Sequence, residues 1–322
     1  MVNQRIYFGI GLLLAVFIIW YGVQTVLMAK PLAKAIKTEV IDIKSGTSSW
    51  VVAKALKNKS LTRSAIHFFI YQKLTGAELV AGIYYLSPSQ TPREIFRTIA
   101  KGKVSEYRIT IPEGWRAEQI GQLLEQKEII SASSFSEAAK AKEGRLFPDT
   151  YRFRVGILPS EIVDKMTANF TKRIEGLKLT DEQLVIASIV EREAKHDEDR
   201  PKMAGVYFNR LKIGMVLEAD PTVQYALDTE RLKSLTAQKL KEFKFWSAPT
   251  AEQNKNFESA YNTYRRKGLP PGPICNPGLA SIKGAINPEK HDYFFFFNLA
   301  DGTTIYSTTR DQHDANRAKY GV

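Results

Sequence analysis

Cysteine is almost absent from this chain, in which Cys275 is the only one among 322 residues. A single cysteine excludes an internal disulfide and any zinc site built on several thiolates. The sequence also lacks the His-Glu-x-x-His motif of zinc proteases, a glycine-rich phosphate loop and the Gly-x-Ser-x-Gly turn of serine hydrolases. We therefore expect the chain to use no metal and no cofactor.

Acidic residues are in the minority. The chain has 46 lysines and arginines against 34 aspartates and glutamates, so its net charge is +12. This balance favours an anionic partner, which could be a phospholipid surface, an acidic wall polymer or nucleic acid. Hydrophobic residues make up 44% and charged residues 25% of the chain, which is typical of globular proteins. The length is sufficient for two or three small domains.

Charged residues are missing altogether between Ile6 and Ala29. At about 1.5 Å per residue, a helix of this length exceeds the roughly 30 Å hydrocarbon core of a membrane. The run is also longer than the apolar region of a cleaved signal peptide, which has about 7–15 residues. We therefore predict a cytoplasmic tip and a single-pass transmembrane anchor at residues 1–29 and a linker at 30–40. The rest would lie on the extracytoplasmic (periplasmic) side of the cell inner membrane, with the membrane as a partner and without access to nucleic acid.

A strand-turn-helix pattern occurs twice within residues 41–145. Ile41–Thr47 and Ile109–Trp115 each alternate apolar and polar residues up to a glycine, Gly46 or Gly114, and apolar residues at helical spacing follow. Glycan-binding LysM modules have the same order of elements, so we predict a LysM-like region here. A generic small α+β unit fits the pattern equally well.

Residues 146–322 are predicted to form a second, larger domain of the α+β class. Thr180–Gln183 has the sequence of a helix capping box, and an almost wholly apolar helix follows from about Asp181 to Lys195. Near the end, Asp292–Asn298 and Thr303–Thr308 flank a turn and predict a β-hairpin. Because apolar residues occupy nearly every side of the Asp181–Lys195 helix, we expect that helix to be buried.

Two glutamates at the end of this apolar helix are candidate general acids. A helical wheel places Glu191 and Glu193 on different sides, each beside aliphatic residues, so periodicity does not choose between them. A carboxyl group in an apolar setting keeps its proton to higher pH, as a general acid must. The alternative is that both are helix-end carboxylates in ion pairs with Arg192, Lys195 or Arg200. A metal site that includes Glu193 is a weaker interpretation.

Two later segments contain the side chains that usually bind sugars. Asp220–Tyr225 and Tyr261–Tyr264 combine hydroxyl groups, an amide and aromatic faces. In the alternative interpretation, Asp220 starts a helix and Asn262 satisfies a turn. The aromatic run Tyr293–Phe297 is predicted to be a strand buried on both faces.

Taken together, these segments resemble the YceG-like family of endolytic murein transglycosylases over nearly the whole chain. The resemblance implies that Glu191 is the catalytic acid. It further implies that a set of polar and aromatic residues lines or supports a glycan cleft. That set comprises Asn209, Asp220, Thr222, Tyr225, Tyr261, Asn262 and His313. The motifs that carry the resemblance are Ile111–Gly114, Leu146–Tyr151, Ile189–Ala194, Phe208–Leu211, Asp220–Tyr225, Tyr261–Tyr264, Gly268–Ile274, Asn276–Gly278, Asp301–Gly302, Ser307–Thr309 and His313.

The function implied by the resemblance is cleavage of the β-1,4 bond between N-acetylmuramic acid and N-acetylglucosamine in nascent peptidoglycan strands. The reaction would leave 1,6-anhydro ends, and it would serve cell wall assembly as a terminase of glycan elongation. Peptidoglycan synthases of elongation or division are the implied partners. One alternative is an anchored, non-catalytic peptidoglycan-binding scaffold. Another is a glycosidase that uses water, with Asp220 as its second carboxylate.

Overall fold

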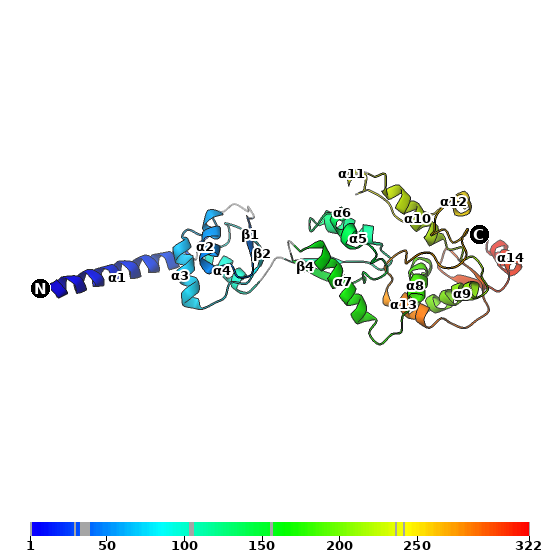
Figure 1. Cartoon of the computed structure of the whole chain (residues 1–322), viewed down its shortest axis with the longest axis horizontal. Coiled ribbons are helices and arrows are strands. Elements are labelled where there is room, and N and C mark those ends of the chain that lie inside the picture. Colours follow the sequence, from blue (N-terminus) through cyan, green and yellow to red (C-terminus); the bar gives the residue numbers. More distant parts are fainter. Residues whose placement is uncertain are drawn as a thin grey trace. The chain divides into compact units, whose positions relative to one another are not determined.

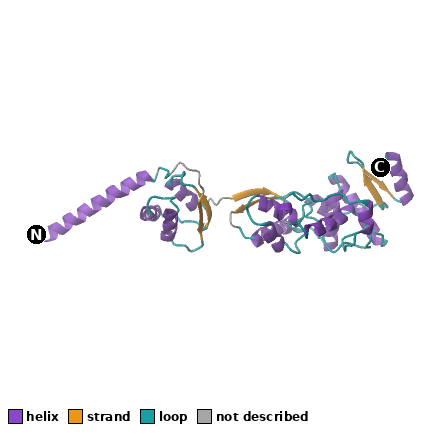
Figure 2. Cartoon of the chain, turned by 90° about the horizontal axis from the view of Figure 1, so that it is seen from above, coloured by secondary structure: helices purple, strands orange, loops and turns teal. Residues whose placement is uncertain are grey.

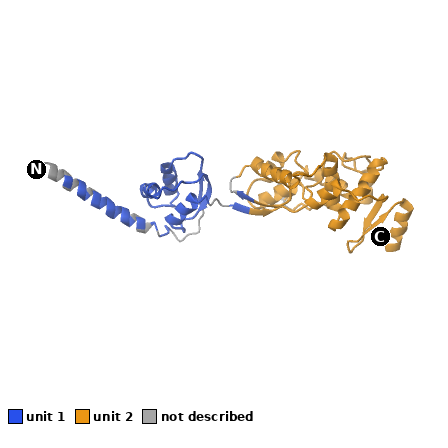
Figure 3. Ribbon diagram, turned by 90° about the horizontal axis from the view of Figure 1, so that it is seen from below, with its two compact units in different colours: residues 1–107, 152–156 blue, residues 108–151, 157–322 orange. Residues whose placement is uncertain are grey.

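The chain folds into two compact units, shown in Figure 3. Unit 1 is Met1–Tyr107 with Arg152–Gly156, and unit 2 is Arg108–Tyr151 with Ile157–Val322. The computed structural model describes residues 2–28, 30–32, 39–102, 106–154, 157–235, 237–240 and 242–321. Over these residues the fold is α+β, with mainly helices and three two-stranded sheets (Figure 2).

Unit 1 is built on an antiparallel pair of strands, β1 and β2, in which Ile41 faces Tyr84. Aliphatic and aromatic side chains from this pair and from three helices form one buried core, which includes Leu56, Phe68 and Ile95. Its elements are α1 (Val2–Leu27), β1 (Glu39–Ile43), α2 (Ser49–Asn58), α3 (Ala65–Thr75), β2 (Gly82–Leu86) and α4 (Pro92–Ala100).

The N-terminal helix corrects one prediction. Within the described part of the chain, no helix is both long enough and apolar enough to cross a membrane. The predicted transmembrane anchor at residues 1–29, and the single-pass inner-membrane location derived from it, are therefore wrong. Most described large side chains of the run, such as Leu12 and Ile18, are exposed, and its last part contacts the core of unit 1. The ring of Tyr21 lies 5.0 Å from that of His67 in α3, and Met28 is buried in the core of unit 1.

Both copies of the strand-turn-helix pattern have the predicted local structure. Gly46 follows β1 with a φ of 80°, and Gly114 follows β3 with a φ of 73°. Only glycine adopts such a left-handed conformation at little cost, and a helix begins shortly after each turn. The two copies lie in different units. Their likeness to LysM modules stays a prediction.

Unit 2 is organised around α8, a helix in which Leu184–Val190 are all buried. The predicted capping box is present, because Thr180 Oγ1 accepts from the Gln183 amide (3.2 Å) and the Gln183 side chain accepts from the Thr180 amide (2.9 Å). Helices α9 and α13 pack against α8 (Figure 1). The remaining elements, some of which begin or end at the boundary of unit 1, are β3 (Glu106–Thr110), α5 (Ala117–Gln126), α6 (Ala132–Ala138), β4 (Thr150–Arg154), α7 (Pro159–Arg173), α8 (Asp181–Glu193), η1 (Asp197–Asp199), α9 (Arg200–Lys212), α10 (Asp220–Leu232), α11 (Ala237–Leu240), α12 (Ala251–Asn256), α13 (Leu279–Ile286), β5 (Phe295–Asn298), β6 (Thr304–Ser307) and α14 (Arg310–Tyr320).

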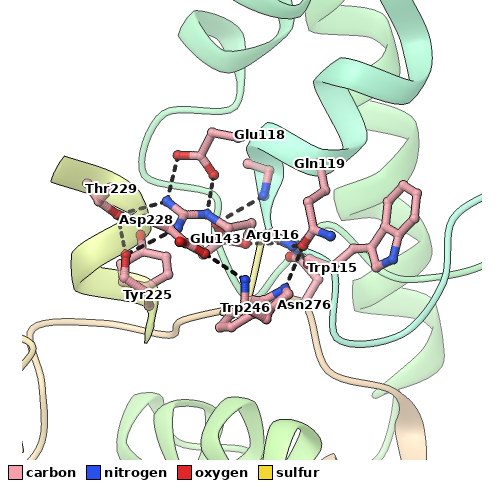
Figure 4. A network of polar contacts seen from close by, with 11 residues as sticks. Trp115, Arg116, Glu118, Gln119, Glu143, Tyr225, Asp228, Thr229, Trp246 and Asn276 are labelled. Carbon is pink, nitrogen blue, oxygen red and sulfur yellow. Dashed lines mark hydrogen bonds and ion pairs between the residues drawn. The ribbon is translucent and has the colours of Figure 1, made fainter. Parts of the chain in front are cut away.

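A buried polar network joins the start of α5 to α10 (Figure 4). The fully buried Arg116 donates to the carbonyl of Tyr225 (3.2 Å) and to Thr229 Oγ1 (2.8 Å) and pairs with Glu118 at 2.7 Å. Glu143 accepts from Asn276 Nδ2 at 2.7 Å, and burial raises the pKa of Glu143 to about 8. These contacts hold the second strand-turn-helix copy on the core of unit 2.

Candidate active site

A cavity of about 530 Å³ lies at the C-terminal end of α8. This volume is within the range of sites that bind small ligands. Residues from α8, α9, α10, the C-terminal hairpin and α14 surround the cavity, so segments more than a hundred positions apart in the sequence meet there. The lining residues are Glu193, Tyr207, Arg210, Leu217, Glu218, Asp220, Tyr264, Phe295, Phe296, Phe297, Asn298, Arg310, His313 and Arg317.

Glu193 is the last residue of α8 and the carboxyl group from this helix that lines the cavity. Burial, reinforced by the negative charge of Asp220, raises the pKa of Glu193 to about 7. The Tyr207 hydroxyl donates to Glu193 Oε1 at 3.3 Å. A glutamate with this pKa is half protonated near neutral pH, so it can both give and take a proton there.

Asp220 is a second carboxylate in the same cavity, in a different environment. It is the first residue of α10. Its Oδ1 accepts from the Tyr264 hydroxyl at 2.6 Å and from Asn254 Nδ2 at 2.8 Å. Two donors to one oxygen fix the orientation of the Asp220 carboxylate. The cavity therefore contains one carboxyl group with a raised pKa beside one carboxylate that is held by hydrogen bonds.

Glu191 lies in a different environment and is not among the residues that line the cavity. Its side chain is only 6% exposed and lies 3.3 Å from Arg200 Nη1. The Gly278 amide donates to Glu191 Oε2 at 2.9 Å. The ion pair that the sequence offered as an alternative is therefore present for Glu191. Burial and the charge of Glu191 also raise the pKa of the neighbouring Glu113.

His313 also lines the cavity, and it belongs to α14. Its side chain packs between Phe295 and Phe297, with both ring centroids 5.5 Å away. The residue is only 9% exposed, and its Nδ1 has no hydrogen-bond partner within the described residues. Burial and the charges of Arg310 and Arg317 lower the pKa of His313. The imidazole is therefore neutral at pH 7.

Five other predicted site residues make structural contacts outside this cavity. Asn209 donates to the carbonyls of His291 (2.8 Å) and Tyr293 (3.0 Å). Thr222 is buried and donates to the Ala219 carbonyl at 2.7 Å. The remaining three form a neighbouring group, in which the Tyr225 and Tyr261 rings lie 4.8 Å apart and Asn262 donates to the carbonyls of Asn254 (2.9 Å) and Phe257 (2.8 Å).

Several lining residues were not predicted. Tyr264 belongs to a motif that the sequence analysis had singled out. Arg310 and Arg317 lie three and four positions from His313, and this helical spacing could have identified them. Tyr207 and Glu218 gave no such signal. The aromatic strand also differs from its prediction, because only Phe295 in β5 is buried and the next three residues are half-buried.

Comparison with known proteins identifies a consistent set of relatives. The model of the YceG-like family matches residues 41–319. An endolytic murein transglycosylase of Bacillus subtilis strain 168 is 30% identical over 91% of this chain and 88% of that protein. One from Streptococcus pneumoniae is 28% identical over 89% of this chain, which spans 59% of that protein. A crystal structure of a yceG-like protein from Listeria monocytogenes shares 27% identity at a TM-score of 0.53, over 88% of this chain and 100% of that one.

Proposed function

The chain belongs to the YceG-like family, and we propose how this member acts. It is a lytic transglycosylase with peptidoglycan as its substrate. We propose that it cleaves the β-1,4 bond between N-acetylmuramic acid and N-acetylglucosamine inside nascent strands. The 6-hydroxyl of the muramic sugar attacks its own anomeric carbon, so the product has a 1,6-anhydro end. Cell wall assembly, as a terminase that works with the synthases of elongation or division, is part of the same proposal.

Glu193 is the general acid and base in this proposal. The observation that carries it is the position of Glu193 in the cavity together with its pKa of about 7. The protonated carboxyl group gives its proton to the glycosidic oxygen as the bond from that oxygen to the anomeric carbon breaks. The resulting carboxylate then takes the proton of the 6-hydroxyl as the new bond to the anomeric carbon forms. One carboxyl group suffices because the nucleophile belongs to the substrate.

Asp220 stabilises positive charge at the anomeric carbon in this scheme. Its carboxylate lines the same cavity and is oriented by Tyr264 and Asn254. A preoriented charge stabilises a transition state without a cost of reorganisation. The same pair of carboxyl groups is compatible with hydrolysis, in which Asp220 would activate a water molecule. The two reactions differ in their product, an anhydro end or a reducing end.

Glu191, the acid implied by the family resemblance, is the competing assignment. Its oxygen is the acceptor of the Arg200 guanidinium and of the Gly278 amide. As an acid it would have to release Arg200 and be reached by a sugar although its side chain is 6% exposed. These contacts favour a structural role for Glu191, and we retain Glu193 as the proposed acid.

The experiment uses the full chain with uncrosslinked glycan strands and mass spectrometry of the products. Glu193→Gln should lower the rate about a thousandfold, within the usual range for loss of a general acid, while circular dichroism shows an intact fold. Glu191→Gln is the matched control, and it should keep more than about a tenth of the activity in the folded fraction. A loss that is specific to Glu191→Gln would reverse the assignment. Reducing ends would indicate hydrolysis, and binding without cleavage by the wild type would indicate a scaffold.

A further inference from the structure

The Glu193 cavity is lined by charged side chains of both signs. Glu193, Glu218 and Asp220 line one part, whereas Arg310 and Arg317 come from α14 with His313. Arg310, His313 and Arg317 are three or four residues apart, so they share one face of that helix. The cavity therefore has an acidic part that would perform the chemistry and a basic part without a role in it.

The guanidinium groups of the basic part are available to a ligand. Arg317 is exposed and makes no hydrogen bond or ion pair with any described residue, and Arg310 uses only its Nε, in an exposed pair with Asp314 at 3.1 Å. The third arginine of the cavity, Arg210, instead donates through its Nε and Nη1 to Glu218 and to the backbone carbonyls of residues 216, 217 and 294. Arg210 has a structural role, whereas Arg310 and Arg317 do not.

His313 is a second sign that the basic part binds a polar ligand. A buried polar atom without a partner is rare in folded proteins, because it has lost its hydrogen bonds to water. Nδ1 of His313 is such an atom, on a side chain that lines the cavity. The neutral imidazole can donate or accept one bond there, next to two cations.

We propose that Arg310, Arg317 and His313 bind a carboxylate of the stem peptide on the muramic sugar at the cleavage site. The inference rests on the proposed function and extends it to the choice of substrate. The peptide is attached through the lactyl group of the sugar whose anomeric carbon reacts, so it begins within a few bonds of the carbon at which Glu193 is proposed to act. Guanidinium groups bind carboxylates with two parallel hydrogen bonds. The enzyme therefore prefers strands that carry peptides with free carboxylates.

The test compares three glycan preparations, namely peptide-bearing strands, the same strands with amidated carboxylates, and strands stripped of peptides by an amidase. For the full-length wild type, kcat/KM should be about tenfold higher on the first than on the other two. The double variant Arg310→Gln/Arg317→Gln should lose this preference through a higher KM and should keep its activity on stripped strands. Lys319→Gln removes one charge from the same helix outside the cavity, and it should change nothing.

Two outcomes would overturn the inference. One is an equal loss on all three preparations by the double variant, which would mean that the arginines serve the sugar chain or the fold. The other is an unchanged preference. Binding of the three preparations to the Glu193→Gln protein tests recognition without cleavage. If the wild type cleaves nothing but this binding still depends on the arginines, the proposed reaction fails and the carboxylate site stands.

Discussion

Glu193→Gln and Glu191→Gln should change the free energy of unfolding in opposite directions, and this contrast tests the roles assigned to the two residues. Glu193 has its pKa raised from 4.5 to about 7 by burial and by Asp220. A raised pKa means that the folded state binds the proton more tightly than the unfolded state. The contribution of protonated Glu193 to the free energy of unfolding is therefore fully present below about pH 4.5 and is lost as the pH rises through 7.

The magnitude follows from the difference of about 2.5 between the two pKa values. At about 1.36 kcal/mol per unit, the ionised Glu193 disfavours folding by about 3 kcal/mol above pH 8. Glutamine has no charge to bury. Glu193→Gln should therefore be more stable than the wild type by about 3 kcal/mol at pH 8 and nearly equal to it at pH 4.

Glu191→Gln should show the opposite effect. It leaves the buried Arg200 without the carboxylate at 3.3 Å, and removal of one partner of a buried ion pair costs about 3–5 kcal/mol. Because Arg200 keeps Asp197 at 2.9 Å, we expect the lower figure.

Native-state hydrogen exchange of the buried amides of α8 is the suitable assay, because it reports the opening of unit 2 separately from unit 1. Each variant is compared with the wild type at one pH, so the intrinsic pH dependence of exchange cancels. A Glu193→Gln protein that is less stable than the wild type at pH 8 would show that Glu193 is a structural ion-pair member. Such a result would contradict the proposed role of Glu193 as the general acid.

The activity and the glycine contacts give two further predictions. The rate of cleavage should fall above about pH 7 as Glu193 loses its proton. Asp220→Asn should move that fall to lower pH, because the charge of Asp220 helps to raise the pKa of Glu193. A fall at the same pH in this variant would show that Asp220 does not affect the pKa of Glu193. Gly205→Ala should destabilise unit 2 by about 2 kcal/mol, because the added methyl carbon would lie 2.5 Å from the backbone oxygen of Glu289. Gly272→Ala is its control in thermal unfolding, since its nearest contact there is 3.4 Å, at Tyr261.

Local patterns in the sequence predicted the local structure well. The capping box at Thr180 and the apolar residues after it predicted a buried helix, which is α8. The two glycines at positions 46 and 114 predicted turns, and both have positive φ. The C-terminal hairpin was predicted from alternation around a turn and is present as β5 and β6. Such features depend on residues within a few positions of one another, so the chain order contains the information.

The N-terminal helix shows the limit of the same reasoning. The absence of charge between Ile6 and Ala29 predicted a membrane span, and within the described residues no helix meets the requirement for one. A run of apolar residues does not say what will cover it. Here Tyr21 contacts His67 in α3, and that contact depends on the fold of unit 1.

The surroundings of Glu191 and Glu193 show what only the tertiary structure decided. The sequence by itself determined that two glutamates end an apolar helix, each beside aliphatic neighbours. It could not determine what packs on each side of that helix, because those groups come from distant segments. Arg200 and Gly278 reach Glu191, whereas Asp220, the C-terminal hairpin and α14 enclose the cavity beside Glu193. The pKa of a carboxyl group depends on the charges near it and on its exposure to solvent, and the folded structure sets both.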